Sequence, residues 1–184
     1  GQDHLDFHAD TEDYFAAKTR LFLGGACRVA VVPADDPCGR RLADLVGADG
    51  RPRLVTTSAD GTPADYRVTA SEALADGGSR VTLAHPGGEV AFEVSLLGEF
   101  NVRNALTALA MVGAAGHDVA TAAAGLAAAQ IPGRMQRIEL GQDAPHVVVD
   151  FAHTPQAIAA ALGALPATGR RIAVTGAGGD RDAT

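Results

Sequence analysis

The sequence predicts an α/β protein, and two runs in which strands alternate with helices carry that prediction. The first run is a β-branched strand over 28–33 that turns into a helix over 35–46. The second is a strand over 146–151, a helix over 154–165 and a further strand over 170–175. A strand, a helix and a second strand in that order are typical of a parallel sheet with a right-handed crossover.

Other elements fill the rest of the chain. Before the first run, Asp10 or Thr11 can cap a helix that continues to about Leu23. Between the two runs, alternating apolar and polar residues predict short antiparallel strands at a sheet edge, and two alanine-rich helices follow them. The strands are predicted at 53–58, 66–70, 80–85 and 89–97, and the helices at 98–115 and 119–129.

A domain boundary is predicted between the two runs. Residues 131–134, which read Ile-Pro-Gly-Arg, interrupt the helical pattern, and residues 141–145 form a turn before the next strand. We therefore predict two domains, over 1–132 and 133–184. Because one strand–helix–strand unit cannot make an independent sheet, we expect the second domain to be part of a larger one.

Composition limits the classes of protein to consider. Apolar residues make up 47% of the 184 residues and charged residues 20%, as in a soluble globular protein. The net charge of −7 argues against binding to a nucleic-acid backbone. The longest apolar run, 105–115, is too short to cross a bilayer. Cys27 and Cys38 lack metal-site spacing and are interpreted as two reduced thiols.

The chain opens with a cluster that could hold a metal ion. Asp3, His4, Asp6 and His8 lie within six residues, and Lys18 is the only lysine in the sequence. Carboxylates and imidazoles are common metal ligands. A solvated loop with a surface amine explains the same residues, and composition favours that simpler interpretation.

Five polar residues further along are candidates for ligand binding. Asn101 and Asn104 share a helix face, although either could be only a cap. Arg134 could form an interdomain ion pair or bind a phosphate or ribose oxygen. Asp150 and His153 follow a strand and precede a helix that Thr154-Pro155 starts, where ligands bind in open α/β sheets. The alternative for Asp150 is a cap on the strand end.

A glycine-rich turn at 176–182 is a weak candidate for a phosphate loop. It lacks the spacing of GxGxxG and of GxxxxGK[ST]. The latter pattern, the P-loop, occurs nowhere else in the chain either.

Five motifs in this order resemble those of the Mur ligases, over essentially all 184 residues. They are Asp-His-Leu-Asp-Phe-His with Tyr-Phe-Ala-Ala-Lys, Gly-Glu-Phe-Asn-Val-Arg-Asn-Ala, Pro-Gly-Arg-Met-Gln-Arg, Val-Val-Asp-Phe-Ala-His-Thr-Pro, and Gly-Gly-Asp-Arg-Asp. Within the family, the chain is most similar to the ligases that add the third residue of the peptidoglycan stem peptide. The resemblance implies a partial P-loop-type central ATPase domain followed by the start of a Rossmann-like C-terminal ligase domain.

The resemblance also implies roles for individual residues. It points to His4 as a ligand of Mg²⁺ and to Lys18 as a carbamylated lysine that helps to hold the same ion. Both would then be catalytic. It points to Asn104, with Asn101 nearby, as the contact to adenine. It places Arg134 and Asp150 near the phosphate and ribose of ATP, and His153 in the nucleotide pocket.

The implied activity is ATP-dependent amide formation in the cytoplasm, through an acyl phosphate. The substrates would be UDP-N-acetylmuramoyl-L-Ala-D-Glu and an amino acid, with meso-diaminopimelate favoured over lysine by a composition that suggests a GC-rich genome. We expect a monomer that binds neither nucleic acid nor membrane. Because the P-loop is not within these residues, we expect them to have no ligase activity alone.

Two alternatives remain open at this stage. A folylpolyglutamate synthase-like ligase has a similar strand-end motif, although Phe151 and Thr154 favour the Mur ligases. A non-catalytic nucleotide-binding module is compatible with the missing P-loop. The presence of His4, Lys18, Arg134 and Asp150 weighs against it.

Overall fold

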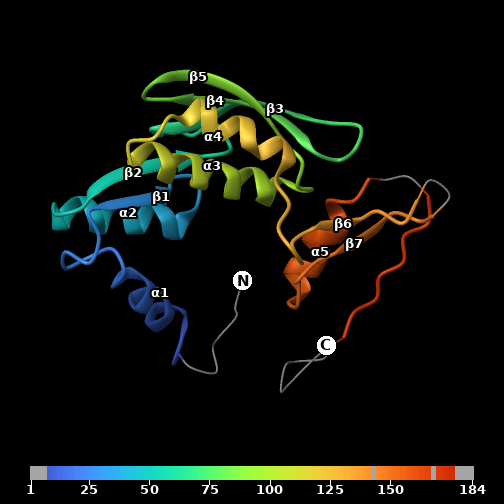
Figure 1. Ribbon diagram of the computed structural model, residues 1–184. Coiled ribbons are helices and arrows are strands. Elements are labelled where there is room, and N and C mark those ends of the chain that lie inside the picture. The colour runs from blue at the N-terminus through green and yellow to red at the C-terminus, as the bar shows by residue number, and fades with distance from the viewer. Residues whose placement is uncertain (1–7, 142–143, 167–168, 177–184) are drawn as a thin grey trace.

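A computed structural model describes residues 8–141, 144–166 and 169–176. These residues form a five-stranded sheet with its helices, followed by a smaller C-terminal region with a two-stranded sheet. Figure 1 shows the two parts side by side, with the C-terminal region next to one end of α3 (Glu99–Ala114). The mixed α/β class predicted from the sequence is confirmed.

The five-stranded sheet runs in chain order and is half parallel, half antiparallel. Its strands are β1 (Val29–Pro33), β2 (Arg53–Ser58), β3 (Tyr66–Ala73), β4 (Ser79–His85) and β5 (Gly88–Val94). β1, β2 and β3 pair in parallel, and β3, β4 and β5 pair as antiparallel neighbours. The prediction that residues 53–58 form an antiparallel strand is therefore wrong. The helix between β1 and β2 returns the chain to the end of the sheet where β1 began, which makes the pair parallel.

The helices of this part begin largely where local capping chemistry places them. They are α1 (Thr11–Thr19), α2 (Pro37–Asp49), α3, α4 (Val119–Ala124) and the 3₁₀ helix η1 (Gly125–Ala128). The carboxylates of Asp10 and Asp36 accept hydrogen bonds from the backbone N–H groups three residues on, as N-caps do. α1 ends at Thr19, short of the predicted Leu23, and the predicted helix over 119–129 finishes as a 3₁₀ turn.

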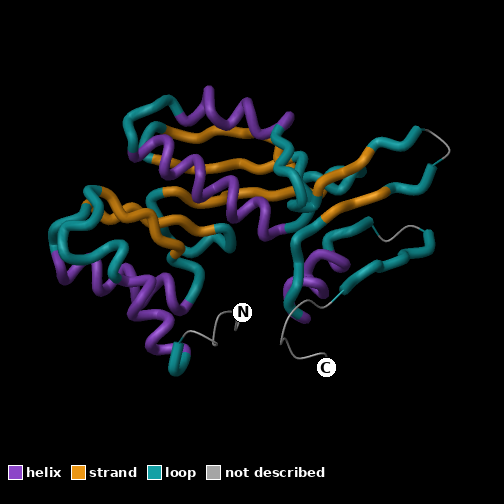
Figure 2. Tube along the Cα trace, turned by 60° about the horizontal axis from the view of Figure 1, so that its bottom comes forward, coloured by secondary structure: helices purple, strands orange, loops and turns teal. Residues whose placement is uncertain are grey.

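Alternating side chains of β1 face two different cores. Val29 and Val31 pack on the side of α3, whereas Ala30 and Val32 are buried against α2. The two-residue period of a strand explains this division, and it indicates that both faces of β1 are covered. Figure 2 shows the strands of the sheet with helices on either side. The larger core lies between the sheet and α3.

The C-terminal region differs from the predicted strand–helix–strand unit. It contains β6 (Gln136–Ile138), β7 (Val147–Val149) and α5 (Pro155–Gly163), with Thr154 as the predicted N-cap of α5. β7 pairs antiparallel with β6, a strand that the sequence analysis missed. Residues 170–175 form no strand. They have β-forming side chains, but a strand also needs a hydrogen-bonded neighbour, and here Val174 is 95% exposed.

Contacts of Arg137 and of Gly98 help to hold the C-terminal region against the five-stranded sheet. Arg137 donates to the backbone oxygen of Asp76 at 2.6 Å and to that of Ser95 at 3.3 Å. Gly98 lies so close to α5 that an added Cβ would come within 3.0 Å of the Ala164 side chain. Its φ of +92° also suits glycine.

Within the described ranges, every helix is too short or too polar to cross a lipid bilayer.

Candidate nucleotide site

The predicted ligand-binding residues gather around one cavity. It has a volume of about 620 Å³ and lies where the start of α3, the linker before β6 and the turn after β7 meet. The walls include all five residues that the sequence analysis assigned to cofactor binding: Asn101, Asn104, Arg134, Asp150 and His153. Cavities of this size suit small-molecule ligands.

The α3 wall is built from two amides that bond to each other. Asn101 is buried, and its side-chain N–H donates to the backbone oxygen of Leu97 at 2.8 Å. Asn104 is exposed one turn later and donates to the side-chain oxygen of Asn101 at 3.2 Å. Neither residue caps α3, because the N-cap position is Gly98.

The same end of α3 is tied to the carboxyl ends of β1 and β2. Arg103 donates to the carboxylate of Asp35, which is almost fully buried just after β1. That carboxylate also accepts the backbone N–H of Ala59, which follows β2. The end of α3 that carries the two amides is therefore held in place by bonds to the segments that follow β1 and β2.

The linker wall has an unusual backbone. Gly133 donates its N–H to the side chain of Gln136, and Arg134 donates its N–H to the backbone oxygen of Ile131. Met135 has a φ of +46°, which is uncommon for a residue with a side chain, and it is 2% exposed. The guanidinium of Arg134 lies 4.9 Å from the ring centre of Phe151, as a cation–π pair. No interdomain ion pair of Arg134 occurs among the described residues.

Asp150 organises the third wall. One carboxylate oxygen accepts the N–H of Met135 and the other accepts the N–H of Ala152, both at 2.8 Å. These hydrogen bonds are the ones expected from the alternative interpretation, in which Asp150 caps the strand end. Asp150 also lines the cavity. Its carboxylate holds the linker and the β7 turn together, which fixes Arg134 relative to His153.

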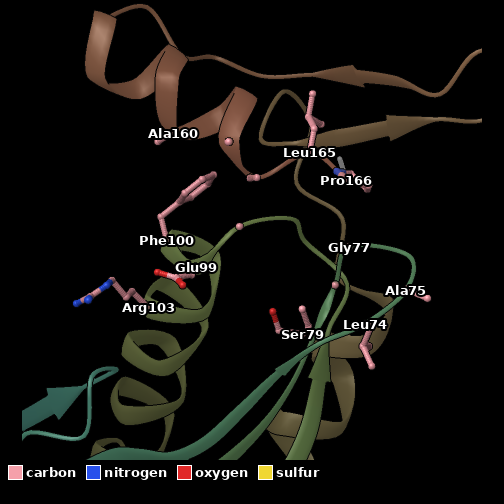
Figure 3. Close-up of a pocket in the computed structure, with 15 residues that line it drawn as sticks. Leu74, Ala75, Gly77, Ser79, Glu99, Phe100, Arg103, Ala160, Leu165 and Pro166 are labelled. Atoms are coloured by element: carbon pink, nitrogen blue, oxygen red, sulfur yellow. The ribbon is translucent and has the colours of Figure 1, made fainter. Parts of the chain in front are cut away.

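Aromatic side chains complete the cavity, and the sequence analysis did not predict them as site residues. Phe151 is 61% exposed, and its ring meets that of His153 edge to face at 5.1 Å. Phe100 lines the cavity from the first turn of α3, and Figure 3 shows it projecting toward Ala160 of α5. Both residues lie within motifs that the sequence analysis singled out, next to a predicted site residue. An aromatic residue beside a predicted site residue in each motif was the available signal.

A second cavity of about 650 Å³ adjoins the first. Phe100 of α3 and Ala160 of α5 line both cavities, so the two cavities meet at these residues. Figure 3 shows the second cavity between α3, the end of α5 and the turn that joins β3 to β4. It contains none of the predicted site residues.

Of the two predicted metal ligands, only Lys18 lies within the described residues, and it is not at either cavity. Lys18 is exposed on α1, with its amine 5.2 Å from the ring centre of Tyr14, and it lines neither cavity. His4 lies outside the described residues. Nearby, His8 bonds to Asp13, and this bond lowers the pKa of the Asp13 carboxyl group. Within the described ranges, no three His, Cys, Asp or Glu side chains form a group that could hold a metal ion.

The first cavity suits a flat aromatic ligand that carries negative charge. Phe100 and Phe151 offer apolar rings, Asn104 offers an amide edge, and Arg134 offers a guanidinium group. Aromatic rings stack on planar bases, and guanidinium binds phosphate or hydroxyl oxygens. A nucleotide has both parts.

Comparison with known families identifies the family of this chain. A model of the Mur ligase middle domain matches residues 1–112, and a model of the Mur ligase glutamate ligase domain matches residues 133–184. The chain belongs to the Mur ligase family. The resemblance stated from the five motifs is thus confirmed.

Individual Mur ligases match the chain over nearly its whole length. Two are UDP-N-acetylmuramoyl-L-alanyl-D-glutamate–2,6-diaminopimelate ligases, from Corynebacterium efficiens at 43% identity and from Streptomyces coelicolor at 42% identity. They cover 100% and 99% of this chain, which spans only 35% and 36% of their lengths. A solved structure of a ligase of the same name matches with a TM-score of 0.72 and 34% identity, over 99% of this chain and 37% of that one. MurF from Acinetobacter baumannii, at 24% identity, has the same fold, with a TM-score of 0.73 over 90% of this chain and 35% of that one.

Proposed function

We propose that this chain supplies part of the ATP site of a ligase that adds the third amino acid to UDP-N-acetylmuramoyl-L-Ala-D-Glu. The observation that carries the proposal is the cavity, because residues predicted to bind nucleotide come to it from three separate segments. The names of the relatives at 42–43% identity support meso-diaminopimelate as the added amino acid.

Each wall of the cavity has a proposed task in holding ATP. Asn104 faces the adenine, and Phe100 and Phe151 cover its apolar surface. Arg134 binds oxygens of the ribose or the phosphates, held in place by its contact with Phe151. His153 lines the pocket, and Asp150 keeps the linker and the β7 turn in register through its two hydrogen bonds.

The proposed reaction has two steps. A carboxylate oxygen of the D-glutamyl residue attacks the γ-phosphorus of ATP, which forms an acyl phosphate and releases ADP. The amine of the amino acid then attacks the acyl carbon, the amide bond forms, and inorganic phosphate and a proton leave. Because water would hydrolyse the acyl phosphate, closure of the C-terminal domain over the site would protect it.

Magnesium is part of the proposal through His4 and Lys18. The Lys18 amine is exposed, so carbon dioxide can reach it, and a carbamate there would offer the oxygen ligands that Mg²⁺ prefers. When bound, the ion neutralises charge on the transferred phosphoryl group.

We also propose the division into domains at 132/133 and a cytoplasmic, monomeric enzyme that binds neither nucleic acid nor membrane. The family matches to 1–112 and 133–184 support the division. The substrates, a UDP-linked muropeptide and ATP, support the location.

The direct test uses the longest natural chain that contains these 184 residues. It is incubated with ATP, UDP-N-acetylmuramoyl-L-Ala-D-Glu and either meso-diaminopimelate or lysine, and the product is identified by mass spectrometry. We expect ADP and a tripeptide product with meso-diaminopimelate, and little product with lysine.

Two results would contradict parts of the proposal. Product with lysine alone would reject the assignment of the amino acid. ATP binding without any product, under conditions in which a known ligase of this name is active, would favour a non-catalytic nucleotide-binding module.

A further inference from the structure

Asn101 has one defined amide orientation. It is 3% exposed, one turn before Asn104 on α3, and its NH₂ group donates to the backbone oxygen of Leu97. A carbonyl oxygen can only accept a hydrogen bond, so the NH₂ end of Asn101 must face Leu97. The side-chain oxygen of Asn101 therefore faces Asn104.

This orientation sets that of Asn104 in turn. Asn104 donates one N–H to the side-chain oxygen of Asn101 at 3.2 Å. Turning the Asn104 amide over would bring two carbonyl oxygens together, with no hydrogen between them. The oxygen of Asn104 and its second N–H are thus left for the cavity that Asn104 lines. No described residue donates a hydrogen bond to that oxygen.

An amide edge held in this way distinguishes between purines. An acceptor beside a donor matches the 6-amino group and the adjacent ring nitrogen of adenine, which is how Asn recognises adenine elsewhere. A 6-oxo purine such as hypoxanthine presents an acceptor in place of the amino group. The Asn104 oxygen would then face another acceptor and lose its hydrogen bond.

We infer that Asn101 is a positioning residue that holds the Asn104 amide with its oxygen toward the ligand, and so selects 6-amino over 6-oxo purine nucleotides. The inference rests on the proposed function, because it takes a purine nucleotide as the ligand of the cavity. Asn101 acts through Asn104. This proposed role differs from the prediction that Asn101 itself binds the cofactor.

The test measures dissociation constants by calorimetry in the longest natural chain that contains these residues. The probes are non-hydrolysable analogues of ATP and ITP, which differ at position 6 of the base. We expect the natural protein to prefer the ATP analogue by about tenfold, as loss of one hydrogen bond in a cavity predicts. In Asn101→Leu, which has a similar volume and no amide, the preference should fall to about twofold or less.

Three further variants separate orientation from general damage. Asn101→Asp still accepts from Asn104 but loses the bond to Leu97, so it should keep the preference even if it is less stable. Thr107→Ala removes a comparable hydrogen bond from α3, the one that the Thr107 hydroxyl donates to the backbone oxygen of Arg103 at 2.9 Å. This variant should also keep the preference for the ATP analogue. Asn104→Leu changes an exposed position, is expected to fold, and should abolish the preference.

The outcomes distinguish this inference from the proposed function. If the natural protein binds ATP but Asn101→Leu or Asn104→Leu keeps the full preference, the positioning role is wrong and the nucleotide site stands. Equal binding of both analogues by the natural protein also rejects the positioning role. If the natural protein binds neither analogue, the proposed function fails and the inference fails with it.

Discussion

The five-stranded region and the C-terminal region are stabilised in different ways. The first buries a continuous core between its sheet and α3, including Leu83 and Leu109 at 2% exposure or less. In the described part of the second region, Met135 is the only buried apolar residue, and α5 buries none. Local hydrogen bonds and contacts with the first region hold the second in place. The cavity proposed to bind nucleotide therefore has one wall on a packed scaffold and two on a region of lower expected local stability.

The largest effect that tests this contrast comes from a matched pair of leucines. Leu83 is fully buried in β4, whereas Leu140 in the C-terminal region is 58% exposed. We expect Leu83→Ala to lower the free energy of unfolding by about 2–5 kcal/mol, because it leaves a cavity. Leu140→Ala should change it by about 0.5 kcal/mol or less. Urea unfolding followed by circular dichroism measures both, and equal losses would mean that the two regions share one core.

A smaller effect is expected from the hydrogen bonds of Asp150. Asp150→Ala removes the acceptor for the N–H groups of Met135 and Ala152. We expect a loss of about 1–3 kcal/mol that is confined to the C-terminal region. Hydrogen exchange at these two amides should become faster. Removal of a cap in the first region, by Asp36→Ala, is the control and should leave both amides unchanged.

The smallest effect is expected on the pH dependence of folding stability, through Asp76 at the contact between the two regions. The N–H of Gly78 and, to a lesser degree, the guanidinium of Arg137 lower the pKa of the Asp76 carboxyl group. A lowered pKa stabilises the folded protein above the unfolded value, near 4, and this stabilisation is lost as the pH falls through the folded value. Asp76→Asn should therefore flatten the decline in stability below pH 4.

The matched control for this prediction is Asp118→Asn. Hydrogen bonds from Thr121, far from the contact between the regions, lower the pKa of Asp118. Both variants should reduce the dependence of unfolding on pH. Only Asp76→Asn should change hydrogen exchange around Arg137, and the same change in both variants would contradict the assignment of Asp76 to the contact.

Local rules predicted local features of this molecule well. Asp10 and Thr154 were identified as helix caps because a cap depends on a few neighbouring residues. Pairing was harder to predict. β2 proved parallel, β6 has only three residues and no clear pattern, and residues 170–175 have strand composition but no partner.

For the site, too, some features could be predicted from the sequence and others could not. The motifs indicated candidate ligand-binding residues, and the structure brings three of them, Asn104, Arg134 and His153, to one cavity. The sequence could not show that Asn101 bonds to the backbone of Leu97, because side-chain orientation depends on three-dimensional packing. It also could not show that both oxygens of Asp150 are occupied by backbone N–H groups.

The central claim, that the two regions together form an ATP site, is tested most directly by the dissociation constant of ATP for Arg134→Ala in the longest natural chain containing these residues. Arg134 belongs to the less buried region, so its loss leaves the main core intact. Arg80→Ala is the control, because Arg80 forms an exposed ion pair with Glu93 on the sheet. We predict that Arg134→Ala weakens ATP binding by about tenfold or more while Arg80→Ala leaves it unchanged. An unchanged dissociation constant for Arg134→Ala would contradict the claim.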